Sequence, residues 1–460
     1  MKKAFLVICV FLSLNTLQAQ SWSELGIGSH ALNANNYIIS ICTDKSGNVY
    51  ASGSFTDTNG YYCVAKWDGV SWSELGALNA NGTIWSICAD ASGNIYAAGS
   101  FHDTNGYSYV AKWDGTVWSQ LGADSTTPNF YNSGILTIAI DASCNVYAAG
   151  QFSDSLIAYK GHEYVAKWNG TTWNELGTGS NALNANAEID AICVDASGNV
   201  YAGGIFTDTS AHFYVAKWDG INWSKLGTGI NGESTSGIGT ICSDAAGNIY
   251  TNGGFADSGY GCVVEFNATS GIWSVLGGVA SLKALSGIGS ICVDASGNVY
   301  TAAVFDSSSI DMNPVIYNAA SGTWSELGKL TTNNYIQSIC LDTSDNVYAA
   351  GDFTDSISST SGHRYVAKYS NPYAGIKEVG KNNDIKIYPN PANDIITIKI
   401  TPAMMDADYF IGDMTGKLLF TGVLENTENK VVIESLASGL YFLKIGNTTI
   451  QKTYKIIIKE

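Results

Sequence analysis

A short pattern, Asn followed by Val or Ile and then Tyr, recurs seven times and limits the fold of this chain more than any other feature. A second pattern, Trp followed three residues later by Leu-Gly, also occurs seven times. A repeat of about 50 residues is one supersecondary unit that must pack on its neighbours to bury its apolar faces. The triplets start at Asn48, Asn94, Asn145, Asn199, Asn248, Asn298 and Asn346, and the Trp residues are Trp22, Trp72, Trp118, Trp173, Trp223, Trp273 and Trp324.

Each repeat contains four strand-like runs. In the first full copy they are the run that ends before Asp44, then 48–55, 64–67 and 71–75. The turn between the first two runs is Asp44-Lys45-Ser46-Gly47-Asn48, in which Gly supplies a positive φ and the Asp and Ser side chains can bond turn amides. The composition agrees, because 50 Gly and 6 Pro in 460 residues suit many short strands joined by tight turns.

The first run of every repeat carries Ile six and three residues before the Asp, as at Ile38 and Ile41. Side chains alternate between the two faces of a strand, so these two Ile residues are expected on opposite faces. Both faces of the run would then be buried between neighbouring units.

The order of the patterns indicates a closed ring. Trp22, Leu25 and Gly26 precede any first run, whereas the last repeat stops after its third run, at Tyr369. We therefore predict an all-β fold in which residues 20–370 form a seven-bladed β-propeller, with the N-terminal strand completing the last blade. Closure removes the open edges of a split ring. A stack of solenoid coils is the alternative, but neither end resembles a cap.

The repeats resemble the kelch, NHL and related bacterial propeller repeats. In those families a turn similar to Asp-x-x-Gly-Asn precedes an apolar strand with glycines near its end. The matching glycines are Gly53, Gly99, Gly150, Gly204, Gly253 and Gly351, with Ala303 interrupting the series. The resemblance implies the fold and leaves the function open.

Residues 1–19 have the form of a secretory signal peptide. Lys2 and Lys3 precede the apolar run 4–14, and cleavage is expected after Ala19. A membrane anchor is the alternative, but the apolar run is about half the ~20 residues that span a bilayer. We expect no membrane span.

The net charge of −17 and the presence of a single arginine, Arg364, argue against a nucleic-acid partner. Ten cysteines in an exported chain would suggest disulfides. Six of them occupy the same place in six repeats, too far apart to pair, so we expect buried thiols. These are Cys42, Cys88, Cys193, Cys242, Cys292 and Cys340.

The repeat ends near residue 370, and residues 371–383 are expected to form a linker. Residues 384–460 alternate strand-like runs with turns, which indicates a small antiparallel β-sandwich. This segment resembles the type A C-terminal sorting domain of the type IX secretion system. The matching residues include Pro389, Asn390, Pro391, Asp394, Gly416, Lys417, Gly439, Leu440, Tyr441, Lys455 and Lys459. The resemblance implies export across both membranes, with the type IX machinery as partner. Removal of the tail and attachment to the surface stay open.

Catalytic motifs are not apparent in the sequence. The five histidines form no metal pair, and no Ser or Cys lies in a nucleophile elbow. We therefore expect a non-catalytic monomer without a cofactor or a metal ligand. The acids that follow the second runs, Asp103 and Asp154 among them, leave calcium open as an alternative to solvated loop acids.

Two kinds of function remain. The first is a surface protein that binds a glycan, a peptide or another surface component. Its ligand is expected on the face with variable loops, near Phe130, Tyr131 and Tyr159, with Asp103 and Asp154 close by. The second is a carbohydrate-active hydrolase or lyase with its site at the mouth of the channel.

Overall fold

The structure is a computed structural model in which two compact units can be described, each by itself. One unit spans Gln20–Asn371, and the other includes Pro372–Glu460. None of the described residues belongs to a helix with the length and hydropathy of a membrane span. The described residues are 22–122, 134–153, 161–227, 237–253, 261–278, 282, 284, 288–304, 312–328, 330, 332–354, 362–369, 385–402, 405, 407–412, 418–446 and 451–458.

Seven antiparallel sheets of four strands form the first unit, one sheet for each repeat. The first strands are β2 Ile38–Thr43, β6 Ile84–Ala89, β10 Ile135–Ile140, β14 Ile189–Val194, β18 Ile241–Ser243, β22 Cys292–Val293 and β26 Ile336–Leu341. The second strands are β3 Val49–Gly53, β7 Ile95–Gly99, β11 Val146–Gly150, β15 Val200–Gly204, β19 Ile249–Gly253, β23 Val299–Val304 and β27 Val347–Gly351.

The two remaining strands of each blade are mostly shorter. The third strands are β4 Ala65–Trp67, β8 Ala111–Trp113, β12 Ala166–Trp168, β16 Ala216–Trp218, β20 Cys262–Asn267, β24 Met312–Asn318 and β28 Ala367–Tyr369. The fourth strands are β5 Trp72–Glu74, β9 Trp118–Gln120, β13 Trp173–Glu175, β17 Trp223–Lys225, β21 Ile272–Val275, β25 Thr323–Glu326 and, for the seventh blade, β1 Trp22–Glu24. Short 3₁₀ turns, η1 Gly28–His30 and η3 Gly179–Asn181, follow β1 and β13.

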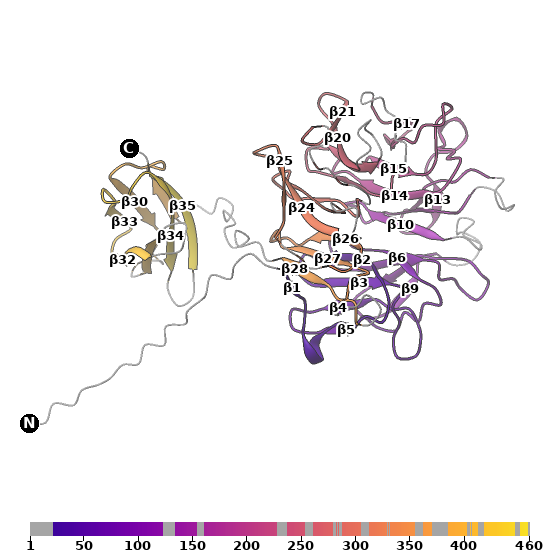
Figure 1. Ribbon diagram of the computed structural model, residues 1–460, viewed down its shortest axis with the longest axis horizontal. Coiled ribbons are helices and arrows are strands. Elements are labelled where there is room, and N and C mark those ends of the chain that lie inside the picture. The colour runs from indigo at the N-terminus through magenta and orange to yellow at the C-terminus, as the bar shows by residue number, and fades with distance from the viewer. Residues whose placement is uncertain are drawn as a thin grey trace, which may run out of the picture. The chain divides into compact units, whose positions relative to one another are not determined.

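The first strands of neighbouring blades contact one another in an unbroken circle. β2 contacts β6 and β26, and the series continues through β10, β14, β18 and β22 back to β26. Figure 1 shows the blades in chain order, from indigo to orange. Because the first strands contact one another around the ring, they form its inner wall, and the prediction of a seven-bladed propeller is confirmed.

The N-terminal strand closes the ring as predicted. β1 pairs with β28 in the register Trp22↔Tyr369, and the indigo β1 lies beside the orange β28 in Figure 1. The amide of buried Leu25 extends this pairing by donating to the carbonyl of Val366 at 2.8 Å. Gly26 has a φ of +87°, and a Cβ there would lie 2.7 Å from the Trp67 ring, so the turn that leaves β1 requires glycine.

The Trp-x-x-Leu-Gly pattern links each blade to the one before it. The indole Nε1 of Trp72, in blade one, donates to the carbonyl of Leu25, in blade seven, at 2.6 Å. The same bond occurs at all seven junctions. In each pattern, therefore, the Trp indole donates to the preceding blade, and the Leu carbonyl accepts from the following blade. The other pairs are Trp22–Leu327, Trp118–Leu75, Trp173–Leu121, Trp223–Leu176, Trp273–Leu226 and Trp324–Leu276.

The expectation that Ile38 and Ile41 lie on opposite faces is wrong. A β-bulge between Ile38 and Ser40 adds one residue to β2, and both Ile side chains pack in one core cluster with Ala350 and Val366 of blade seven. The extra residue interrupts the alternation of side chains between the two faces of the strand. Residues three positions apart across the bulge therefore lie on the same face. The same bulge occurs in β6, β10, β14 and β26.

Apolar clusters fill the space between neighbouring blades. Each cluster combines second-strand residues of one blade with the first-strand Ile residues of the next, as Tyr50 packs with Ile84 and Ile87. Complete burial of such a side chain contributes about 1.5–3 kcal/mol. Cys42 packs against the same cluster, and the nine cysteines within the described ranges are free thiols.

The second unit is a β-sandwich of two antiparallel sheets, as predicted. One sheet has the order β29-β30-β33 and the other β32-β31-β34-β35, with buried Ile396, Ile411, Leu443 and Ile456 in the core between them. Strand β29 was not predicted from the sequence. The strands are β29 Ile385–Tyr388, β30 Ile395–Ile400, β31 Ala407–Gly412, β32 Leu418–Leu424, β33 Glu428–Val432, β34 Gly439–Gly446 and β35 Gln451–Ile458.

Candidate ligand-binding site

The connections of the blades divide the propeller surface into two faces. Antiparallel order places the links between first and second strands, and between third and fourth strands, on one side, which we call the short-turn face. The links between second and third strands, and from each blade to the next, emerge on the other side, the variable-loop face. A ligand site is expected on one of these two faces, since the sides of each blade are packed against its neighbours.

The acidic residues nearest the channel on the short-turn face are occupied by their own turns. Asp44 Oδ1 accepts the amides of Ser46 and Asn48 at 2.8 and 3.0 Å, and Oδ2 accepts Asn48 Nδ2 and the Tyr50 hydroxyl at 2.6 and 2.9 Å. Burial raises the pKa of Asp44, but these hydrogen bonds outweigh it and the net shift is downward. The same four bonds form in every blade. The equivalent residues are Asp90, Asp141, Asp195, Asp244, Asp294 and Asp342.

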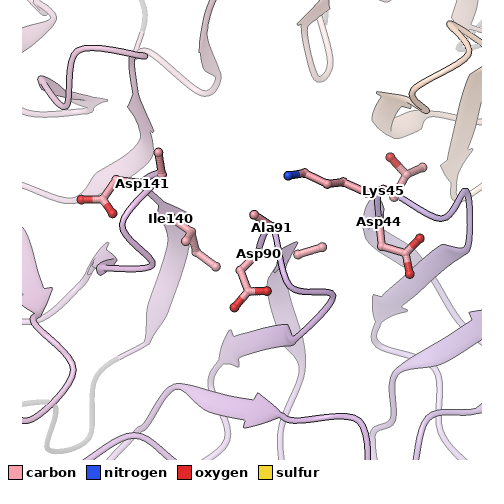
Figure 2. A pocket seen from close by; sticks show the side chains of 9 residues that line it. Asp44, Lys45, Asp90, Ala91, Ile140 and Asp141 are labelled. Atoms are coloured by element: carbon pink, nitrogen blue, oxygen red, sulfur yellow. The ribbon is translucent and has the colours of Figure 1, made fainter.

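A cavity of about 220 Å³ opens between three of these turns, at residues 43–45, 89–91 and 140–142. Figure 2 shows the Lys45 side chain extending into the open space, while the carboxylates of Asp44 and Asp90 point away from it. A ligand there would meet the Lys45 ammonium group, because the carboxylates of Asp44 and Asp90 are hydrogen-bonded within their own turns. This cavity offers little specific recognition.

Turn capping also occupies predicted acids of the variable-loop face. Asp103 Oδ1 accepts the amides of Asn105 and Tyr107 at 2.8 and 3.0 Å, and Asp57 and Asp208 cap their loops in the same way. Asp103 is therefore tied to its loop through one oxygen. The other predicted ligand-binding residues lie outside the described residues, and they are Phe130, Tyr131, Asp154 and Tyr159.

Exposed aromatic side chains lie at the inner edge of the variable-loop face, where first strands begin. Tyr335 precedes β26, Tyr37 precedes β2, and Trp85 is the second residue of β6, so they belong to three consecutive blades. Their exposed fractions are 38%, 43% and 38%, respectively. Large aromatic rings exposed beside a rigid ring of strands form a stacking surface for a ligand.

Two ionisable residues lie next to these rings, Arg364 at Tyr37 and Asp352 at Tyr335. The Arg364 guanidinium carbon is 4.9 Å from the centre of the Tyr37 ring. The Asp352 amide donates to the Tyr335 carbonyl at 2.9 Å, and Asp352 Oδ2 accepts Gln337 Nε2 at 3.3 Å. Burial raises the pKa of Asp352, against the opposing effects of the Gln337 hydrogen bond and the Arg364 charge.

A second group of polar residues lies at the same edge, in blades three and four. Gln151 Nε2 donates to Glu188 Oε1 at 2.9 Å, and Asp190 follows two residues after Glu188. Burial, together with the Glu188 charge, raises the pKa of Asp190 to about 6. This carboxyl group therefore keeps its proton to a higher pH than an ordinary aspartate does.

Sequence reasoning missed Tyr37, Trp85, Tyr335 and Asp352 as site residues, and it used Arg364 only to argue against nucleic acid. Comparison of the seven repeats at the positions just before each strand could have found Arg364. Where blade seven has Arg364, blades one to six have Tyr62, Ser108, Glu163, Phe213, Gly261 and Met312. The residue at this position therefore differs in every blade, and Arg364 is the only basic residue among the seven.

The predicted sorting-signal residues cluster around the strands of the second unit. Pro389, Asn390 and Pro391 follow β29, and the Asp394 carbonyl accepts the Ile433 amide at 2.7 Å. Strand β34 begins at Gly439, and its buried Tyr441 donates its hydroxyl to the Ala437 carbonyl at 2.8 Å. The backbone register pairs Leu440 with Ile457 and Lys455 with Phe442, and Gly416, Lys417 and Lys459 lie outside the described residues.

The C-terminal unit matches a known family. Residues 386–459 match the family described as the secretion system C-terminal sorting domain, which agrees with the resemblance found in the sequence. None of the curated proteins matches the chain significantly. The chain is therefore an exported β-propeller protein with a type IX C-terminal sorting domain, directed to the cell surface or the medium.

Solved propeller structures are similar to the chain at low identity. PorZ of Porphyromonas gingivalis, described as an essential surface component of the type-IX secretion system, is 14% identical with a TM-score of 0.46, over 92% of this chain and 59% of PorZ. The chain thus spans 59% of that protein. The propeller of the Trilobed protease from Pyrococcus furiosus is 10% identical with a TM-score of 0.47, over 73% and 96%. The Dos1 propeller is 12% identical with a TM-score of 0.46, over 75% and 82%. Such similarities concern the fold alone.

Proposed function

We propose that this exported propeller is a non-catalytic binding protein whose ligand, a glycan, a peptide or another surface component, contacts the variable-loop face. The proposal rests on a difference between the two faces in the side chains that they leave available to a ligand. On the short-turn face, both oxygens of each channel-side Asp are occupied within its own turn, as at Asp44. On the variable-loop face, aromatic rings are exposed where the first strands begin, and Arg364 lies over one of them, Tyr37.

A binding experiment with the mature protein tests this proposal. Glycan arrays and surface polysaccharide from the native host would be screened first, and affinities then measured by calorimetry. The triple variant Phe130→Ala, Tyr131→Ala and Tyr159→Ala should weaken binding at least tenfold, about 1.4 kcal/mol, without lowering the melting temperature. Unchanged affinity in this variant, together with a loss on substituting Lys45, would assign the ligand to the short-turn face instead.

One observation favours the alternative of a carbohydrate-active hydrolase. Burial and the charge of Glu188, two residues away, raise the pKa of Asp190 to about 6, and glycoside hydrolases use two carboxyl groups, one of which is kept protonated by its surroundings. Release of reducing ends from a bound polysaccharide, abolished by Asp190→Asn, would support that function. Binding that leaves the polysaccharide intact supports a non-catalytic protein.

A further inference from the structure

The outer side of the three-stranded sheet β29-β30-β33, which we call the basic face, carries more positive than negative charge. Lys386 in β29 lies directly opposite Lys399 in β30, and Glu428 in β33 lies on the other side of Lys399. Lys430 belongs to the same face, because alternate residues of a strand share a face. All four residues are exposed. The face therefore combines three lysines with one carboxylate, in a chain whose net charge is −17.

The register of these lysines opposes folding. Like charges that lie directly opposite each other in adjacent strands are destabilising, and Lys386 faces Lys399 in this way. In the part of the chain that the structure describes, neither of them, nor Lys430, forms an ion pair with a carboxylate. Residues that oppose folding without a gain in packing are expected at functional surfaces.

The repeated lysines of the propeller have a different use. The Lys66 ammonium nitrogen lies 5.8 Å from the centre of the Tyr50 ring, and the same contact recurs in four other blades. Each of these lysines therefore interacts within its own blade. Among the described residues, the three lysines of the basic face make no such contact, so they are available to a partner.

Apolar side chains lie at the other end of the basic face. Ile395 pairs with Val432, and their exposed fractions are 41% and 54%. Tyr388, which lies opposite Thr397, is 41% exposed. Exposed aliphatic and aromatic side chains beside unpaired lysines fit a protein surface that offers carboxylates next to an apolar patch.

We propose that the basic face is the surface through which the sorting domain contacts the export machinery, and that the machinery presents an acidic protein surface with an apolar patch to it. The face lies within the segment that matches the sorting-domain family, residues 386–459. A sorting domain acts by being recognised, so its recognition surface has to be exposed. The inference concerns a different unit and a different partner from those of the proposed ligand-binding function.

Export of the full chain in the native host tests this inference. A variant that combines Lys386→Gln, Lys399→Gln and Lys430→Gln should reach the surface and the medium in amounts at least tenfold lower, with the chain retained in the periplasm. Arg at the same three positions keeps the charge and should keep export near the parent level. The purified Gln variant should melt at or above the parent temperature, because the repulsion between Lys386 and Lys399 is removed.

Matched variants separate recognition from general damage. Ile395→Thr combined with Val432→Thr keeps the strand preference of both positions and should lower export at least threefold. Lys444→Gln removes an exposed lysine from β34, in the other sheet, and should leave export unchanged. The inference is overturned if the triple Gln variant is exported as the parent is, if it melts well below the parent, or if Lys444→Gln lowers export equally.

A membrane surface is the other class of partner that a basic face can meet. Flotation of the purified protein with vesicles of phosphatidylglycerol and phosphatidylcholine measures such binding. Vesicle binding that the triple Gln variant loses, together with normal export of that variant, would assign the face to lipid and overturn the inference. If a chain truncated after residue 383 is retained while the triple Gln variant is exported, the second unit is recognised through another surface.

Discussion

The indole Nε1 of Trp22 donates a hydrogen bond of 2.7 Å to the carbonyl oxygen of Leu327, although 305 positions of the sequence separate them. Trp22 also packs on Tyr369, with ring centres 5.4 Å apart. Both contacts are copies of those made by the other blades, where the fourth strand is held in addition by the hairpin turn from the third. At the seventh blade that hairpin is missing, so β1 is joined covalently only to the link that leads to β2, and side-chain and ladder contacts hold it against β28.

Replacing Trp22 should therefore destabilise the ring more than the same change elsewhere. We expect Trp22→Ala to lower the free energy of unfolding by about 2–4 kcal/mol, through lost packing and a lost hydrogen bond. Trp118→Ala, which removes the same bond between blades two and one, is the matched control and should cost about 1–2 kcal/mol less. Urea unfolding of both variants measures the difference.

Deletion of residues 21–26 is the stronger form of this test. The deletion exposes the edge of β28, and the melting temperature should fall well below that of Trp22→Ala. A deletion variant that melts with the intact protein would contradict the closure of the ring.

The seven blades, their four strands and the closure by β1 could be predicted because each depends on a pattern repeated along the chain. The face occupied by Ile41 could not, because the bulge at Ser40 leaves no mark in the spacing of apolar residues. The cluster of Tyr37, Tyr335 and Arg364 was missed for a different reason. It forms where the last blade meets the first, so its members come together only after the ring is closed.

A second prediction concerns Gly150, which ends the second strand of blade three and pairs with Ile135 beside the bulge. A Cβ on Gly150 would lie 2.7 Å from the Leu136 amide nitrogen and overlap the Gly134 carbonyl. Gly150→Ala should cost about 2–3 kcal/mol, because backbone atoms cannot move aside as a side chain can.

Gly134→Ala, in the same blade, is the control. Its nearest added contact is Gln151 Oε1 at 3.3 Å, the flexible end of a side chain. This variant should melt within about 2 °C of the parent. Equal losses in the two variants would show that close backbone approach at Gly150 is not the cause.

The raised pKa of Asp190 predicts how stability depends on pH. The folded protein holds this proton up to about pH 6, whereas an unfolded Asp loses it near pH 3.9. The folded state therefore binds more protons between these values, and the contribution of Asp190 to stability falls as the pH rises from about 4 to 6. Asp190→Asn should remove this dependence.

Partial exposure of Asp190 limits the size of the effect to about 1 kcal/mol. We expect Asp190→Asn to melt about 1–2 °C above the parent at pH 7.5 and no higher than the parent at pH 4. Calorimetric scans at both values measure this. A variant that gains the same amount at pH 4 and pH 7.5 would show that protonation is not responsible.

Export should depend on the second unit. In the native host, a chain truncated after residue 383 should fold its propeller and remain in the periplasm, since the matched sorting domain is absent. Cell fractionation and immunoblotting locate the product. A truncated chain that reaches the surface or the medium would show that the sorting signal lies elsewhere.

The position of β1 also orders the events of folding. Its partner β28 is the last strand of the propeller to leave the ribosome, so the first strand made is the last to pair. Each earlier blade can assemble from a segment of about 50 residues, whereas the final blade requires contact across nearly the whole unit, and such contacts form slowly. Until then both Trp22 and the β28 edge are available to other chains. While the ring is open, β1 of one molecule can pair with the β28 edge of another. Faster closure of the ring therefore reduces the amount of this intermolecular pairing.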